Sequence, residues 1–172
     1  NQIEATRKVA QMDHVLAWTQ NDEPDLPVKV TDPATGKTTW QPRDTLEEAA
    51  KCYRAVKALG SGRPVLIGFT SNFMSDQNDK YDRAAKERIY PAYAKFGDGV
   101  GYDTYPIFGY NRPDHLYRVS MVVSELRALA GPGKAIGCAI ETNKGSKWVK
   151  PENQLDVLPK HTRAEVWMAL IS

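Results

Sequence analysis

The chain has 172 residues, of which 41% are hydrophobic and 26% are charged, as expected for one folded domain with a core of its own. Its formal net charge of +2 comes from Lys and Arg scattered among Asp and Glu. This balance excludes an electrostatic basis for binding nucleic acid or an anionic membrane. No apolar run approaches the roughly 20 residues that a membrane-spanning helix requires, so we expect no membrane partner.

Both ends of the sequence fall inside helical patterns, which predict helices over residues 3–12 and 162–171. Chain termini usually fray into polar segments. We therefore expect residues 1–172 to be a piece of a longer protein.

The first predicted strand, over residues 14–19, is short and apolar and is followed by a long excursion. Within that excursion, residues 28–40 alternate in character around a turn that contains Asp32, Pro33 and Gly36. Alternation around such a turn is typical of a β-hairpin. We therefore predict a hairpin insertion over residues 28–40.

A helix and a second strand follow the hairpin. Thr45 and Glu48 form a capping-box sequence, and the apolar residues after them keep helical spacing as far as Leu59. Residues 64–70 are a near-continuous apolar run, which is the pattern of a strand that a parallel sheet buries on both faces.

The rest of the chain repeats this alternation. The pattern predicts a helix around residues 82–90, a strand over 99–105, a helix capped by Asp114, a strand over 135–140 and the helix over 162–171. Strands that alternate with helices are joined by right-handed crossovers and form a parallel sheet, so the predicted class is α/β. Four such βα units make half of a (β/α)8 barrel, which typically needs about 250 residues. The alternative is an open four-stranded sheet with both faces covered.

Two glutamates lie just after predicted strands. Glu23 follows the first strand in an acidic turn before Pro24, and Glu141 follows the fourth strand. Because ligands of parallel α/β sheets bind at the carboxyl ends of the strands, both carboxylates are expected at the mouth of the fold. A solvated loop carboxylate, or a residue at a helix N-terminus before Pro24, is the alternative for Glu23.

Five segments, in this order and spacing, carry a resemblance to a known family: residues 18–25, 62–67, 101–106, 140–143 and 163–168. They resemble the second half of the barrel of retaining glycoside hydrolases of the 4/7 superfamily, in which the acid/base follows the fourth strand and the nucleophile follows the seventh. The resemblance covers nearly the whole chain. It implies that residues 1–172 are a partial catalytic domain, from the fourth barrel strand to the helix after the seventh.

The resemblance also implies roles for particular residues. Glu23 corresponds to the general acid/base, and Glu141 corresponds to the nucleophile. Asp22 stands where the family usually has an Asn that contacts the sugar 2-hydroxyl, while Asn21 lies one residue earlier. A tyrosine of the third strand region commonly hydrogen-bonds the nucleophile in the family, which indicates Tyr105.

Other residues are candidates for substrate binding on chemical grounds. Asp103 lies at the end of the third predicted strand. Trp148, in a polar loop, and Trp40, on the hairpin, have faces suited to packing against the axial hydrogens of a pyranose. Asn143 is a candidate ligand of sugar hydroxyls. A packing or surface role is the alternative for each of them, and we interpret Trp167 as a core residue.

The chemistry explains why two carboxylates are needed. Glycosidic cleavage passes through an oxocarbenium-like state, so one carboxylate attacks or stabilises the anomeric carbon while a second carboxyl protonates the leaving oxygen. Retaining enzymes hold the two groups about 5 to 5.5 Å apart, where the charge of one opposes ionisation of the other. One of them thereby stays protonated near neutral pH.

No cofactor and no metal site are expected. The sequence has no glycine-rich phosphate loop before a helix, no Cys-X-X-Cys pair and no His-Glu-X-X-His motif. Cys52 and Cys138 are interpreted as two buried thiols.

Three hypotheses therefore stand. The first is a fragment of a retaining glycoside hydrolase whose partner is an oligo- or polysaccharide, for which a secreted or periplasmic location is favoured. The second is a carbohydrate-binding descendant of such a barrel without turnover. The third is a metal-dependent barrel enzyme with Glu23, Asp103 and Glu141 as oxygen ligands. A half barrel leaves unpaired strand edges, so we expect it to pair with the rest of its own barrel or with a second copy, and to be inactive alone.

Overall fold

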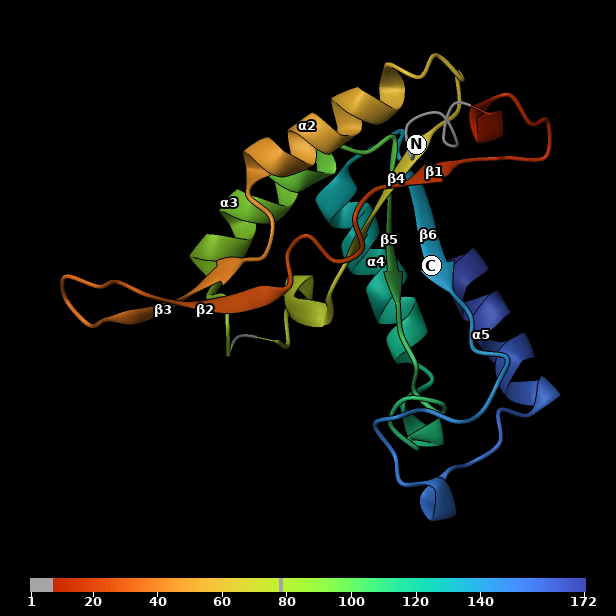
Figure 1. Cartoon of the computed structure of the whole chain (residues 1–172). Coiled ribbons are helices and arrows are strands. Elements are labelled where there is room, and N and C mark those ends of the chain that lie inside the picture. Colours follow the sequence, from red (N-terminus) through yellow and green to blue (C-terminus); the bar gives the residue numbers. More distant parts are fainter. Residues whose placement is uncertain (1–7, 78) are drawn as a thin grey trace.

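The computed structural model describes residues 8–77 and 79–172. Its main sheet has four parallel strands in the order β1 (Trp18–Thr19), β4 (Val65–Phe69), β5 (Gly99–Asp103) and β6 (Ala135–Ala139) (Figure 1). Its longer helices are α2 (Leu46–Lys57), α3 (Arg83–Ala94), α4 (Arg118–Ala130) and α5 (Pro159–Ile171). Short 3-10 helices are η1 (Ser71–Phe73), η2 (Pro113–His115) and η3 (Pro151–Asn153). The predicted α/β class and parallel sheet are confirmed.

The four longer helices form a single layer on one face of the sheet. Each strand lies next to the preceding strand of this sheet, always in the same direction across it. Because crossovers between parallel strands are right-handed, this steady progression places every connecting helix on the same side. The helices pack in chain order, α2 against α3, α3 against α4 and α4 against α5. The described residues therefore do not form an open sheet with both faces covered.

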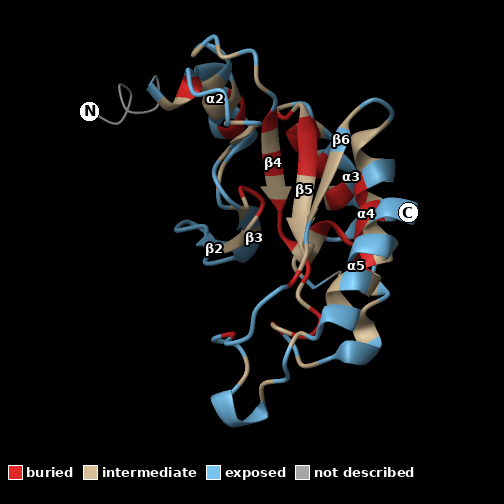
Figure 2. Ribbon diagram, turned by 90° about the vertical axis from the view of Figure 1, so that its right-hand side faces the viewer, coloured by how far each residue is buried: buried red, intermediate tan, exposed pale blue. Residues whose placement is uncertain are grey.

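The two faces of the sheet differ in their side chains. Ile67 and Val100 are paired in register, are fully buried and share a core cluster with residues of the helices, so they lie on the helix side of the sheet. Both β4 and β5 carry buried residues (Figure 2). On the opposite face, the register aligns Gly68, Gly101 and Gly137 in one row across three strands. A glycine inside a strand commonly marks a place where a ligand or another backbone approaches closely.

The core between the sheet and the helices is rich in aromatic rings. Phe69 of β4 meets Tyr90 of α3 edge to face, with ring centroids 5.4 Å apart. Phe73 meets Tyr90 and Tyr102 in the same way, at 6.2 and 5.4 Å. Such edge-to-face pairs stabilise a core beyond their burial alone, by about 0.5–1.5 kcal/mol each.

Several local predictions are confirmed. The hairpin consists of β2 (Pro27–Thr31) and β3 (Thr38–Pro42), paired antiparallel. The capping box forms as predicted, because the Glu48 N–H donates to Thr45 Oγ1 at 3.2 Å and the Thr45 N–H donates to Glu48 Oε2 at 2.7 Å. Both cysteines are free thiols, although they are half-buried rather than buried. Independently of these predictions, the described residues contain no helix that is both long and apolar enough to cross a membrane.

The first predicted strand and the helix before it differ from expectation. Most of the predicted helix over 3–12 lies outside the described residues, and only residues 8–10 of it are seen as helical. The predicted strand over 14–19 pairs only at its last two residues. The backbone before these two residues is held by a side chain and not by strand pairing: Arg63 donates to the carbonyl groups of Ala10, Met12 and Val15.

Two further predictions are wrong. Asp114 does not cap the helix that follows it, because its carboxylate binds the Arg112 side chain at 2.8 and 3.0 Å, and α4 begins at Arg118 without a side-chain cap. Trp167 is not a core residue: it is 60% exposed on α5, together with Leu170 and Ile171. These side chains give α5 an exposed apolar surface.

A buried carboxylate, that of Asp25, connects the loop after β1 to the rest of the core. Asp25 is 0% exposed and accepts hydrogen bonds from the Thr70 N–H at 2.9 Å, the Thr70 hydroxyl at 2.6 Å and the Tyr90 hydroxyl at 2.8 Å. The Tyr81 hydroxyl donates to its carbonyl at 2.8 Å. Burial raises the pKa of Asp25, and the bonds from Thr70 and Tyr90 act in the opposite direction.

We predict that Asp25→Ala lowers the free energy of unfolding by about 3–5 kcal/mol, because it leaves three buried donors without an acceptor. Urea unfolding of the chain measures this. The matched control is Asp156→Ala, which removes an exposed carboxylate that pairs with Lys144 and should cost less than about 1 kcal/mol. Equal losses in the two variants would contradict the central role of Asp25.

Candidate functional site at the carboxyl edge of the sheet

Three of the predicted site residues meet at the carboxyl edge of the sheet. Asp22 and Glu23 follow β1, and Asp103 ends β5. The Asp22 carboxylate lies over β4, where its Oδ1 is 3.9 Å from the position that a Cβ atom on Gly68 would take. The charges of Asp22 and Asp103 both act on Glu23. We call these three residues the acidic cluster; it lies on the sheet face that carries the glycine row.

Glu23 has a strained backbone. Its φ is +47°, in the left-handed region, which costs a residue with a Cβ atom about 1–2 kcal/mol. The turn is closed by the Leu26 N–H, which donates to the Glu23 carbonyl at 3.0 Å. Buried Asp25 anchors the same turn. Strain that is held in place by surrounding structure is typical of functional sites.

The environment of Glu23 favours its protonated form. Burial raises the pKa of Glu23, and the charges of Asp22, Asp103 and Asp25 raise it further, while Arg43 acts in the opposite direction. A carboxyl group with a raised pKa keeps its proton at a higher pH than an ordinary glutamic acid. It is therefore suited to donate a proton as a general acid.

Tyr105 extends the acidic cluster toward an aromatic surface. Its hydroxyl donates to Asp103 Oδ2 rather than to Glu141, which corrects the contact that the resemblance implied. Burial, the hydrogen bond with Asp103 and the nearby charge of Asp22 raise the pKa of Tyr105. Tyr105 therefore remains a hydrogen-bond donor across the physiological pH range.

Trp148 stacks on Tyr105, with ring centroids 6.3 Å apart and an interplanar angle of 24°. Phe108 meets both rings edge to face. Gly109 is required beside them, because a Cβ atom there would lie 2.8 Å from Tyr105 and 3.7 Å from Trp148. Trp148 is 57% exposed. The three rings thus present an exposed aromatic surface that is joined to the acidic cluster through Tyr105.

Glu141 occupies the predicted place after β6 but is only 2% exposed. Its Oε1 accepts the Ile107 N–H at 3.0 Å, and its Oε2 accepts the Phe108 N–H at 2.5 Å. The loop that follows β5 therefore covers the carboxylate. The acidic residue beside it is Glu165, whose Oε2 accepts the Glu141 N–H at 3.1 Å. Glu141 is not among the charges that shift the pKa of Glu23.

The remaining predicted residues lie outside these contacts. Asn143 is exposed, and its side chain has no hydrogen-bond partner among the described residues. Asn21 donates to Asp44 Oδ2 at 3.1 Å, so it does not replace Asp22 in the cluster. Trp40 packs against the core, and the Lys29 and Lys80 ammonium groups lie 5.3 and 4.5 Å from its ring centroid.

Asp25 and Glu165 were not predicted as important, although both are fully buried carboxylates. A signal for Glu165 exists in the sequence, where it stands alone among apolar residues at 164–171. A surface helix would place a carboxylate there on its polar face. No comparable signal marks Asp25, since acidic residues are common in turns.

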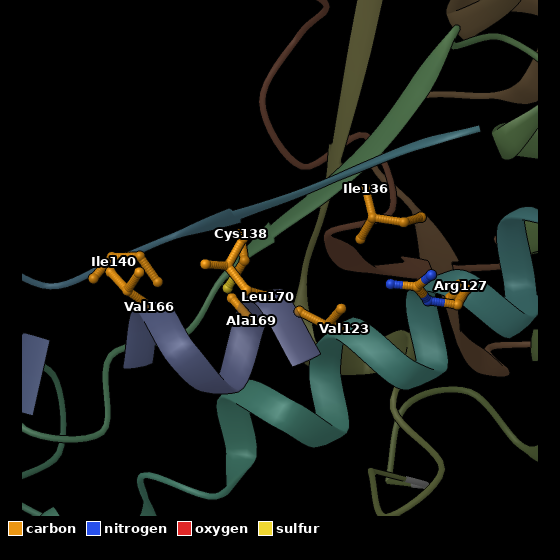
Figure 3. A pocket seen from close by; sticks show the side chains of 8 residues that line it. All are labelled: Val123, Arg127, Ile136, Cys138, Ile140, Val166, Ala169 and Leu170. Atoms are coloured by element: carbon orange, nitrogen blue, oxygen red, sulfur yellow. The ribbon is translucent and has the colours of Figure 1, made fainter. Parts of the chain in front are cut away.

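A pocket of about 280 Å³ lies away from the acidic cluster, on the helix side of β6 (Figure 3). Val123, Arg127, Ile136, Cys138, Ile140, Val166, Ala169 and Leu170 line it. Its only charged side chain is that of Arg127. Among the described residues, the acidic cluster included, no group of three or more His, Cys, Asp or Glu residues is arranged to hold a metal ion.

Comparison of the chain with family models, with curated proteins and with solved structures found no match. We therefore base the proposed function on the acidic cluster, the aromatic surface and the fold that holds them.

We predict that the free energy of unfolding of the Glu23→Gly variant is about 1 kcal/mol higher than that of the Glu23→Ala variant, because glycine adopts a positive φ without steric cost. Urea unfolding of both variants measures the difference. Glu47, exposed in the first turn of α2, is the control position. There Gly should be about 1 kcal/mol less stable than Ala. The same sign at both positions would show that Glu23 is not strained.

Proposed function

We propose that the chain is the second half of the barrel of a retaining glycoside hydrolase, and that Glu23 is its general acid/base. The observation that carries the proposal is the half-buried Glu23 carboxyl, whose pKa is raised by burial and by three neighbouring aspartates at the carboxyl edge of a parallel sheet. A general acid for glycosidic cleavage needs this property, because it must reach the leaving oxygen still protonated.

The one-sided helix layer supports the barrel. A closed (β/α)8 barrel has helices outside and side chains of its strands inside. Here the helices cover one face, and the other face holds the glycine row and the acidic cluster. The edge strands β1 and β6 would pair with the remaining strands of the barrel, and the exposed apolar residues of α5 would pack against the next helix.

The aromatic surface supports a carbohydrate ligand. A flat exposed ring such as that of Trp148 packs against the apolar hydrogens of a pyranose, and Asp22 and Asp103 can accept hydrogen bonds from its hydroxyl groups. Because Tyr105 touches both Asp103 and Trp148, a sugar stacked on the tryptophan would lie beside the acidic cluster.

Glu141 is the proposed nucleophile, and its position follows β6 as Glu23 follows β1. Two backbone N–H groups fix its carboxylate in one orientation. For attack on an anomeric carbon, the loop of Ile107 and Phe108 must uncover one of the oxygens. We propose that substrate binding against the rest of the barrel does this, so the chain alone is expected to be inactive.

The test uses the full-length protein that contains this chain. We predict that Glu23→Ala lowers hydrolysis of alkyl glycosides about 10²–10⁴-fold, because the poor leaving group then departs without a proton. Hydrolysis of 2,4-dinitrophenyl glycosides, which need no proton, should change much less, and added azide should restore turnover. Initial rates over a panel of sugars measure both effects. Glu47→Ala is the control.

Trapping with 2-deoxy-2-fluoroglycosyl fluorides identifies the nucleophile in the same protein. Mass spectrometry should place the label on Glu141. A label on any other carboxylate, or equal losses of Glu23→Ala activity with both leaving groups, would refute the assigned roles.

A second candidate function is carbohydrate binding without turnover. The observation that favours it is the 2% exposure of Glu141, since a covered carboxylate cannot attack a sugar. In this case the aromatic surface binds the ligand, and Glu141 only holds the loop after β5.

This candidate predicts that Trp148→Ala weakens oligosaccharide binding about 3- to 10-fold, because a stacking contact contributes about 0.5–1.5 kcal/mol. Calorimetric titration of the chain with a panel of oligosaccharides measures the affinity. Trp167→Ala, which removes a similarly exposed tryptophan on α5, is the matched control. Binding without any hydrolysis or label on Glu141 in the full-length protein favours this candidate, whereas a trapped Glu141 ester excludes it.

A further inference from the structure

Two side chains of helix α5 bind the main chain of Glu141. Glu165 Oε2 accepts the Glu141 N–H at 3.1 Å, and Thr162 Oγ1 donates to the Glu141 carbonyl at 3.0 Å. Residues three apart lie on the same face of a helix, so one turn of α5 binds both polar backbone groups of the residue. With the Ile107 and Phe108 N–H groups on its carboxylate, Glu141 is fixed from two sides.

Glu165 is an unusual residue for this position. It is 0% exposed, although its neighbours Val166 and Trp167 are exposed. Its Oε1 is buried and accepts no hydrogen bond in the described part of the chain. A buried carboxylate with one oxygen lacking a donor is costly, and protonation lowers this cost because it removes the buried charge.

The surroundings of Glu165 favour that proton. Burial and the neighbouring Glu141 carboxylate raise the pKa of Glu165 to about 8, while its bond to the Glu141 backbone acts in the opposite direction. From β6 the facing titratable group is Cys138, whose pKa burial and Glu165 raise to about 11. From α4, Arg127 lines the same pocket as Cys138.

We propose that Glu165 is a positioning residue: as a neutral carboxylic acid it holds Glu141 by its backbone and leaves the negative charge of the buried pair to the Glu141 carboxylate. Resting on the proposed function, this gives Glu165 the task of keeping the nucleophile charged and in place. Ionisation of Glu165 puts a second negative charge beside Glu141 in a buried site, and the contact between α5 and the end of β6 weakens.

Ionisation of Glu165 should change the stability of the fold, which can be measured without any enzymatic activity. A carboxyl whose pKa is higher in the folded chain than in the unfolded chain stabilises the fold fully below the unfolded value, and this contribution is lost as the pH rises through the folded value. For Glu165 the window runs from about 4.5 to about 8. The native chain should therefore lose stability across this range.

The test measures thermal unfolding of the chain and of its Glu165→Gln variant from pH 4.5 to 9. Glutamine copies the neutral carboxylic acid in shape and has no proton to lose. The variant should lack this part of the pH dependence and should melt above the native chain at pH 9. Glu152→Gln, which changes an exposed carboxylate to an amide, is the control and should follow the native curve. Parallel curves for the Glu165→Gln variant and the native chain would overturn the proposal.

A second variant distinguishes the effect of the charge on Glu165 from the effect of simply attaching α5 to residue 141. Thr162→Val removes the bond to the Glu141 carbonyl but leaves Glu165 unchanged. It should lower the melting temperature at every pH and keep the native pH dependence. If Thr162→Val abolished the pH dependence as Glu165→Gln does, the effect would belong to the fit of α5 and not to the proton on Glu165.

The positioning role is tested by the rate of label formation at Glu141 in the full-length protein. Glycosyl fluorides need no proton from Glu23, so the rate reports on the nucleophile alone. In the native protein the rate should fall above about pH 8, and in Glu165→Gln this fall should disappear. An unchanged fall in Glu165→Gln would overturn the positioning role. Absence of any label in both proteins would instead refute the proposed function. The unfolding curves would still show whether Glu165 is protonated beside Glu141 in the folded chain.

Discussion

The buried carboxylate of Asp25 is the contact on which the candidate site depends. It lies two residues after Glu23 and accepts hydrogen bonds from Thr70 at the end of β4 and from Tyr90 of α3. These bonds attach the loop after β1 to the end of β4 and to the helix layer. A turn that was free in solvent would relax away from a positive φ at Glu23, because that conformation is unfavourable for a residue with a Cβ atom. The buried anchor therefore keeps the acidic cluster at the edge of the sheet.

The direction of strand addition determines where a ligand can lie. Since every strand adds on the same side of its predecessor, right-handed crossovers place all four helices on one face. The opposite face is left with a glycine row at its centre and the acidic cluster at its carboxyl end. This asymmetry is what supports a barrel interior. In the proposed barrel, the apolar residues exposed on α5 would pack against the next helix.

The two glutamates that the sequence singles out have different environments. Glu23 is half-buried among aspartates, so its proton is favoured by burial and by charge. Glu141 is covered by the loop after β5 and held by backbone N–H groups, with Glu165 beside it. The pair is therefore not a symmetric dyad in this state of the chain. The two candidate functions differ in whether the loop after β5 uncovers Glu141, and that is why they share most of their residues.

By itself, the sequence determined the elements whose causes are local: the hairpin, the capping box at Thr45, the alternation of strands and helices and hence the parallel sheet. Strand ends also placed Glu23 and Glu141 at one edge. The tertiary structure alone decided which partners these residues have. Glu141 bonds to the loop after β5 and to Glu165 of α5, because the packing of the sheet and the helices brings these distant segments together. The bonds of Tyr105 to Asp103 and of Arg112 to Asp114 join residues only two positions apart, and the sequence pattern did not reveal them. The burial of Asp25 and Glu165 was also decided by the tertiary structure, since the sequence around a carboxylate does not show which segments will cover it.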